Sequence, residues 1–153
     1  MHLLLLRHAH AVDHAASDHA RPLSEKGHQQ ARAVASFLLT YPTRPDLVLS
    51  STAVRALETA QPVAGALGVE LQSCPWAVPG MDPQSAIGAL RGFRNCKAVL
   101  LVGHQPDLSD LIAALLGMRS SGHLHVRKAL LAHLRLLSAD SATLEAFIPC
   151  KHP

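Results

Sequence analysis

The 153-residue chain has few aromatic residues and no long apolar segment. Aromatic residues make up 3% of the chain, which leaves little for stacking nucleic-acid bases, and its 14 Lys and Arg residues are spread out. These features disfavour nucleic-acid binding. No stretch approaches the roughly 18 apolar residues of a membrane-spanning helix, and the run of four leucines at the start is too short for a signal peptide. We therefore expect neither secretion nor a membrane partner.

Cysteine is also scarce, and the three cysteines are Cys74, Cys96 and Cys150. An odd set without CxxC spacing disfavours a disulfide framework and a structural zinc site. Some of the 11 histidines stand in alternate pairs, as at 8 and 10 and at 123 and 125, which leaves histidine-rich metal binding as an alternative. These pairs have no neighbouring carboxylate or thiolate in the sequence that could complete a metal site. We predict a cytoplasmic protein without a metal or cofactor.

Aliphatic residues dominate what is present, because hydrophobic residues make up 48% of the chain. Short apolar runs bounded by polar residues are typical of strands buried on both faces of a parallel sheet. Such runs lie at 3–6, 47–49 and 98–102, with a shorter strand expected at 69–73. Two final strands, joined by a polar turn in a hairpin, are expected at 128–137 and 143–148.

Helical periodicity separates these strands. The expected helices cover 24–40, a segment capped by Thr52 and ended by Gly68, 84–91 after the cap Asp82, and a segment from Pro106 to Gly117. Alternation of strand and helix implies right-handed crossovers. We predict a single domain over residues 1–153, an α/β fold in which a mainly parallel central sheet is the middle layer of a three-layer α/β/α sandwich.

Polar residues follow three of the expected strands. Arg7 and His8 end the first strand, Arg55 lies about one turn into the helix after the second, and His104 follows the 98–102 strand. In parallel sheets, ligands collect at the carboxyl ends of the strands. Arginine matches phosphate oxygens, and a neutral imidazole can accept a phosphoryl group and release it to water. We call these four residues the anion cup.

The motifs around the anion cup stand in a familiar order. The Arg-His pair ends the first strand, a Ser-x-x-x-Arg-Ala-x-x-Thr-Ala stretch covers 51–60, and a glycine precedes His104. In these motifs, and over almost its whole length, the chain resembles the histidine phosphatase superfamily. Its short length, its lack of a cap insertion and the stretch 18–24 are most similar to the small SixA-type phosphohistidine phosphatases.

The resemblance implies a role for each residue of the anion cup. His8 would be the nucleophile that forms a phosphohistidine intermediate, and Arg7, Arg55 and His104 would surround the phosphoryl group. No metal is then required. This agrees with the physical argument, because a transferring phosphoryl group carries spread negative charge that fixed cationic donors stabilise.

Three further residues are expected to bind substrate: Asp18, Arg21 and Ser51. A simpler interpretation of the first two is a solvated ion pair on the surface. Two departures from the family are also visible. Ala9 follows the Arg-His pair where a glycine is usual, and the 75–79 loop lacks the carboxylic general acid of larger relatives. An imidazole leaving group depends less on an acid than an alkoxide does, so the missing acid favours phosphohistidine as the substrate.

We therefore predict a monomeric, metal-independent phosphatase that removes phosphate from phosphohistidine in a protein partner, such as a histidine-containing phosphotransfer domain of a signalling pathway. One alternative is a small-molecule phosphomonoesterase of the same superfamily. Another is a binding module that holds phosphate in the anion cup without turnover, which the missing acid and Ala9 would favour. A substrate panel with chelator and with His8→Ala separates these functions.

Overall fold

The structure is a computed structural model that describes residues 1–150. Its strands are β1 (His2–Arg7), β2 (Leu47–Ser51), β3 (Glu70–Cys74), β4 (Ala98–Gly103), β5 (Leu130–Leu136) and β6 (Ala142–Pro149). Its helices are α1 (Glu25–Thr40), α2 (Val54–Leu67), α3 (Pro83–Leu90) and α4 (Asp107–Leu116). Short 3-10 turns cover Pro75–Ala77 and Arg91–Phe93. The elements expected from the sequence are present, and their bounds shift by only a few residues.

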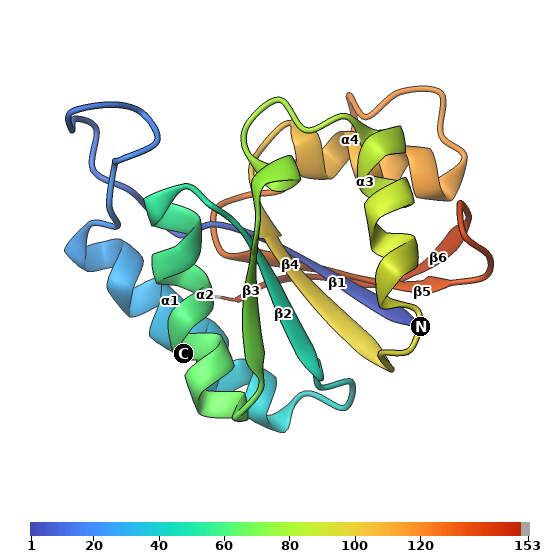
Figure 1. The fold of residues 1–153 in the computed structure, drawn as a ribbon, viewed down its shortest axis with the longest axis horizontal. Coiled ribbons are helices and arrows are strands. Elements are labelled where there is room, and N and C mark those ends of the chain that lie inside the picture. Colours follow the sequence, from blue (N-terminus) through green and yellow to red (C-terminus); the bar gives the residue numbers. More distant parts are fainter. Residues whose placement is uncertain (151–153) are drawn as a thin grey trace.

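The strands form a six-stranded sheet in the order β3-β2-β4-β1-β5-β6. β3, β2, β4 and β1 pair in parallel, whereas β5 is antiparallel to β1 and β6 is antiparallel to β5. Figure 1 shows α1 and α2 together on one side of the sheet and α3 and α4 together on the other. The prediction of an α/β sandwich with a mainly parallel sheet and a closing hairpin is confirmed.

The first strand illustrates how the core is divided between the two faces. Successive strand residues point to opposite sides. Leu3 and Leu5 therefore pack in the cluster that includes α3 and α4, while Leu4 and Leu6 pack in the cluster that includes α1 and α2. All four are fully buried, which is why the sequence shows an unbroken apolar run instead of an alternating one.

Local signals set most helix ends. The Ser24 side chain caps α1 by accepting a hydrogen bond from the Gly27 N–H, and Asp82 caps α3 in the same way. Gly68 ends α2 in a left-handed conformation. The expected Thr52 cap is wrong: α2 begins after Ala53 with no side-chain cap, and the Ser51 hydroxyl accepts from the Ala53 N–H instead.

Residues 8–24 form the loop over the carboxyl ends of the central strands. It is irregular apart from a single bridge between Ala11 and Leu23. Gly27 in the first turn of α1 lies so close to the His10 carbonyl that a Cβ there would overlap the oxygen. Over residues 1–150, no helix is both long and apolar enough to cross a membrane.

Candidate functional site

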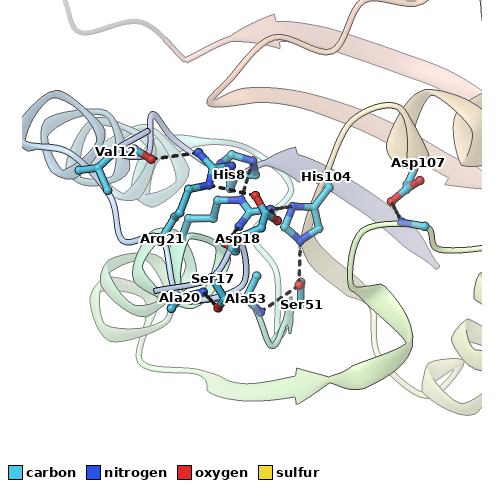
Figure 2. A network of polar contacts seen from close by, with 12 residues as sticks. His8, Val12, Ser17, Asp18, Ala20, Arg21, Ser51, Ala53, His104 and Asp107 are labelled. Carbon is cyan, nitrogen blue, oxygen red and sulfur yellow. Dashed lines mark hydrogen bonds and ion pairs between the residues drawn. The ribbon is translucent and has the colours of Figure 1, made fainter. Parts of the chain in front are cut away.

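The register of β1 against β4 brings the two histidines of the anion cup together. Arg7 lies opposite Gly103, so His8 and His104 each stand one residue beyond neighbouring parallel strands. The His8 N–H donates to the Gly103 carbonyl at 3.0 Å. The centroids of the two imidazole rings are 5.2 Å apart, and both side chains are buried. Figure 2 shows these two rings in one network with Asp18 and Arg21.

The hydrogen bonds of His8 define which ring nitrogen is available. Nδ1 lies 2.7 Å from the Ala9 carbonyl oxygen, which can only accept, so Nδ1 carries the hydrogen. Nε2 is then the acceptor, and the Arg55 Nε–H points to it at 3.4 Å. Burial, together with the smaller effects of the Arg55, Arg7 and Lys128 charges, lowers the pKa of His8 to about 4, although the hydrogen bond to Ala9 acts in the opposite direction. At neutral pH, Nε2 therefore presents a lone pair.

Arg55 is the most connected residue of the anion cup. Its side chain is buried although it carries a charge. Its guanidinium donates to the Asp18 carbonyl at 2.7 Å and to the Asp18 carboxylate at 3.1 Å, and it approaches His104 Nδ1 at 3.5 Å. Because α2 places Arg55 in its first turn, the helix dipole adds to the positive potential there. The arrangement is suited to an anion bound against His8.

Asp18 joins the two arginines outside the histidine pair. One carboxylate oxygen accepts from Arg55 and the other from Arg21 Nε at 3.0 Å. Burial opposes ionisation of this carboxyl, but Arg55 and Arg21 outweigh it and hold its pKa below the usual range. Asp18 and Arg21 both line the anion cup. The ion pair expected on the surface is thus present at the rim of the anion cup, with its carboxylate ionised.

Arg7 contributes a donor from the other side. Its Nη1 donates to the Val126 carbonyl at 3.1 Å. Its Nε is buried and finds no hydrogen-bond partner within residues 1–150. Arg7 lines the same pocket as His8 and Arg55, so its guanidinium is one of the cations around His8.

His104 is oriented from behind by Ser51. Its Nε2 lies 2.8 Å from the Ser51 hydroxyl, and Nδ1 faces Arg55. Burial lowers the pKa of His104 to about 3, and the neighbouring His8 and Arg55 act in the same direction. Ser51 is fully buried and does not line the anion cup. The substrate contact expected of Ser51 is therefore corrected to a positioning role, which Figure 2 shows as the bond below the His104 ring.

The structure adds lining residues that the sequence argument missed: Ala11, Pro79, Gln105 and Lys128. The pocket around the anion cup is open to solvent and has a volume of about 230 Å³, which is enough for a phosphoryl group. Lys128 is a fourth cation at this site and precedes β5. Its signal in the sequence was weak, since one lysine in a loop after a glycine-containing segment is usually a solvated residue.

Ala9 is accommodated without backbone strain. Within residues 1–150, Ala129 is the only non-glycine residue with a positive φ, so Ala9 does not adopt the conformation that would favour glycine. The Ala9 N–H donates to the Thr59 hydroxyl at 3.0 Å, and that hydroxyl donates to the Arg55 carbonyl at 2.7 Å. Thr59 thereby connects the residue after His8 to the helix that carries Arg55.

One buried carboxyl lies near the anion cup without entering it. Asp107 accepts from the Gly80 N–H at 2.9 Å and links α4 to the loop after β3. Burial raises its pKa. Figure 2 shows its carboxylate on the far side of His104, away from His8. Over residues 1–150, no group of three or more His, Cys, Asp or Glu side chains is arranged to hold a metal ion.

Comparisons with known proteins agree with this geometry. The family model of the histidine phosphatase superfamily, branch 1, matches residues 3–75. The chain is 34% identical to an uncharacterised protein of Picosynechococcus over 143 residues, which are 88% of this chain and 85% of that protein. It is 31% identical over 131 residues to the phosphohistidine phosphatase SixA homolog of Haemophilus influenzae, covering 78% of this chain and 80% of that protein.

A solved structure of the protein histidine phosphatase SixA, complexed with tungstate, superimposes with a TM-score of 0.89 at 25% identity. The superposition covers 98% of this chain and 97% of the SixA chain. Fold, motif order and sequence identity thus point to one group of proteins. The chain belongs to the histidine phosphatase superfamily and, within it, to the small SixA-like proteins.

Proposed function

We propose that the protein is a metal-independent phosphatase that removes phosphate from phosphohistidine in a protein substrate. The observation that carries the proposal is the state of His8, whose Nδ1–H is used by the Ala9 carbonyl and whose Nε2 faces Arg55. A buried imidazole with a pKa of about 4 is unprotonated at neutral pH and can attack phosphorus. A related protein histidine phosphatase, SixA, has been solved in complex with tungstate, an oxyanion like phosphate, which agrees with phosphate binding by this group of proteins.

Two displacements make up the reaction. In the first, a bond forms between His8 Nε2 and phosphorus while the phosphorus–nitrogen bond of the substrate breaks. The substrate imidazole, which has taken a proton from solvent on its other ring nitrogen, keeps the electron pair of the broken bond and leaves as a neutral base. In the second, a water oxygen bonds to phosphorus, the bond to Nε2 breaks, and the water proton leaves to solvent. Arg7 and Arg55 meet the negative charge spread over the equatorial oxygens in both steps.

The carboxyl groups near the anion cup explain the choice of phosphohistidine. Asp18 is bound to two guanidinium groups with a lowered pKa, so it holds no proton to donate at neutral pH. The Asp107 carboxyl accepts a hydrogen bond from the Gly80 N–H and does not line the anion cup. An alkoxide leaving group requires a proton donor, whereas an imidazole is a much weaker base and leaves without one. The site thus favours a phosphoramidate over a phosphate monoester.

The small volume of the anion cup supports a protein partner. A space of about 230 Å³ that is open to solvent can receive a phosphoryl group presented from outside. A histidine on the surface of a folded protein, such as a phosphotransfer domain, is presented in this way. We propose that the protein acts on such a partner as a monomer in the cytoplasm.

The test is a substrate panel of phosphohistidine peptide, phosphoserine, phosphotyrosine and sugar phosphates, measured by phosphate release with and without chelator. We expect turnover of phosphohistidine alone, unaffected by chelator. His8→Ala should abolish it, and acid-sensitive phosphate should accumulate on wild-type His8 in a quenched reaction. His123→Ala, which removes an exposed histidine, is the matched control and should retain activity.

Each other outcome assigns a different function. Faster release from sugar phosphates than from phosphohistidine would identify a small-molecule phosphomonoesterase. Binding of phosphate without turnover or labelling of His8 would identify a binding module. Loss of activity with chelator would indicate metal chemistry through the histidines.

A further inference from the structure

A second groove adjoins the anion cup and shares Lys128 with it. The groove has a volume of about 410 Å³, larger than the anion cup. Polar side chains from two distant segments line it, together with Ala129 and the end of β6: Lys26, Gln29, Gln30, Arg127 and Lys128. We call this the basic groove.

The charge of the basic groove is of one sign. Three cationic side chains and two amides line it, and no carboxylate within residues 1–150 does. The three cations are exposed. Two acidic residues lie in the vicinity: Asp13 is near enough for its charge to act on the pKa of Lys128, and Glu25 pairs with Arg32 at 4.0 Å. Partial burial of Lys128 lowers its pKa, and the charges of Arg7, Arg21 and Lys26 lower it as well. The positive charges of the two sites therefore act on one another.

The backbone at the junction of the two sites is held in an unfavourable conformation. Ala129, directly after Lys128, has φ of 57°, in the left-handed region that is unfavourable for a non-glycine residue. Two backbone bonds hold it there: its N–H donates to the Arg7 carbonyl at 3.1 Å, and its carbonyl accepts from the Cys150 N–H at 3.3 Å. The fold thereby fixes Arg127 and Lys128 relative to the strand end that carries His8.

We propose that the basic groove binds an acidic segment of the phosphohistidine-bearing protein partner, beside the histidine whose phosphoryl group enters the anion cup. The inference rests on the proposed function and names the surface that selects its partner. A phosphoryl group bound at His8 would offset part of the positive charge of the anion cup. Lys26 and Arg127 line the basic groove and not the anion cup, and their charges are complementary to carboxylates that flank the phosphohistidine.

The experiment compares two peptides of equal length with a central phosphohistidine, one flanked by glutamates and one by glutamines. The variant Lys26→Gln/Arg127→Gln removes two cations that line the basic groove and not the anion cup. The matched control, Arg44→Gln/Arg94→Gln, removes two exposed cations elsewhere. We expect wild type to prefer the acidic peptide, and the groove variant to lower kcat/KM for it about 2- to 20-fold, from typical energies of exposed ion pairs. The control variant should keep the preference for the acidic peptide. Added salt should weaken this preference in wild type.

The outcomes separate the two proposals. If wild type turned over neither peptide, the proposed function would fail. If it turned over both with equal efficiency, or if the groove variant lowered kcat/KM equally for both, the basic groove would not select the partner. Inhibition by a short oligonucleotide that exceeded inhibition by the unphosphorylated acidic peptide would also overturn the assignment to a protein segment.

Discussion

Lowering the pH from 7 to 5 is expected to destabilise the protein through the two histidines of the anion cup. Both are nearly inaccessible, with 6% of His8 and 3% of His104 exposed. Their pKa values in the folded protein are about 4 and about 3, against 6.5 for an unperturbed histidine. Between the folded and unfolded values the unfolded chain binds more protons, so the free energy of unfolding falls as the pH falls through this window.

The magnitude follows from linkage. At pH 5 an unfolded histidine is almost fully protonated, while folded His8 and His104 remain largely neutral. Each histidine then removes about 2 kcal/mol of stability between pH 7 and pH 5, and the pair about 4 kcal/mol. This is a large part of the roughly 5 to 15 kcal/mol that stabilises a typical domain.

Urea unfolding at pH 7 and pH 5 measures this difference for wild type, His8→Gln and His104→Gln. Each variant lacks one buried imidazole and should lose about 2 kcal/mol less than wild type over this pH interval. Burial also lowers the pKa of His133. Because His133 is present in all three proteins, its contribution to the pH dependence of stability cancels in the comparison. The control His123→Gln should behave as wild type. If His8→Gln lost as much stability as wild type, His8 would not be buried in its neutral form.

Three further predictions concern the site and its support. Arg55→Ala should lower kcat about 10²- to 10³-fold, because Arg55 Nε lies 3.4 Å from Nε2 of His8, the proposed nucleophile; a change confined to KM would instead indicate ground-state binding. The kcat/KM for phosphohistidine should rise from acid pH through about 4, the pKa of His8, to a broad plateau. A bell-shaped profile that lost its alkaline limb in Asp18→Asn would contradict the acid-free mechanism. Gly27→Ala should reduce stability in urea by about 1 to 3 kcal/mol, since its Cβ would overlap the His10 carbonyl; an unchanged unfolding midpoint would refute the close approach.

The sequence by itself determined the layers and the order of elements. The leucine run at 3–6 and the run at 98–102 are local signals, because a strand buried on both faces must be apolar at every position. The caps Ser24 and Asp82 are also local, since a cap contacts residues three positions ahead. The motif order likewise placed Arg7, His8, Arg55 and His104 at neighbouring strand ends, where the structure brings them together.

Only the tertiary structure decided how these side chains are supported. Ser51 was expected at the substrate and instead lies behind His104, because that contact joins residues 53 positions apart. Which ring nitrogen of His8 faces Arg55, and how strongly burial lowers the pKa of His8, depend on packing that no spacing rule predicts.

Lys128 and the basic groove are the clearest case of tertiary control. Lys128 reaches the anion cup because Ala129 bonds to the carbonyl of Arg7 and thereby joins the start of β5 to the end of β1. Arg127 and Lys26 come from segments about a hundred residues apart and meet only when β5 and α1 pack near the same end of the sheet. Apolar periodicity specifies which elements form, but the position of a charged loop residue depends on the register between elements.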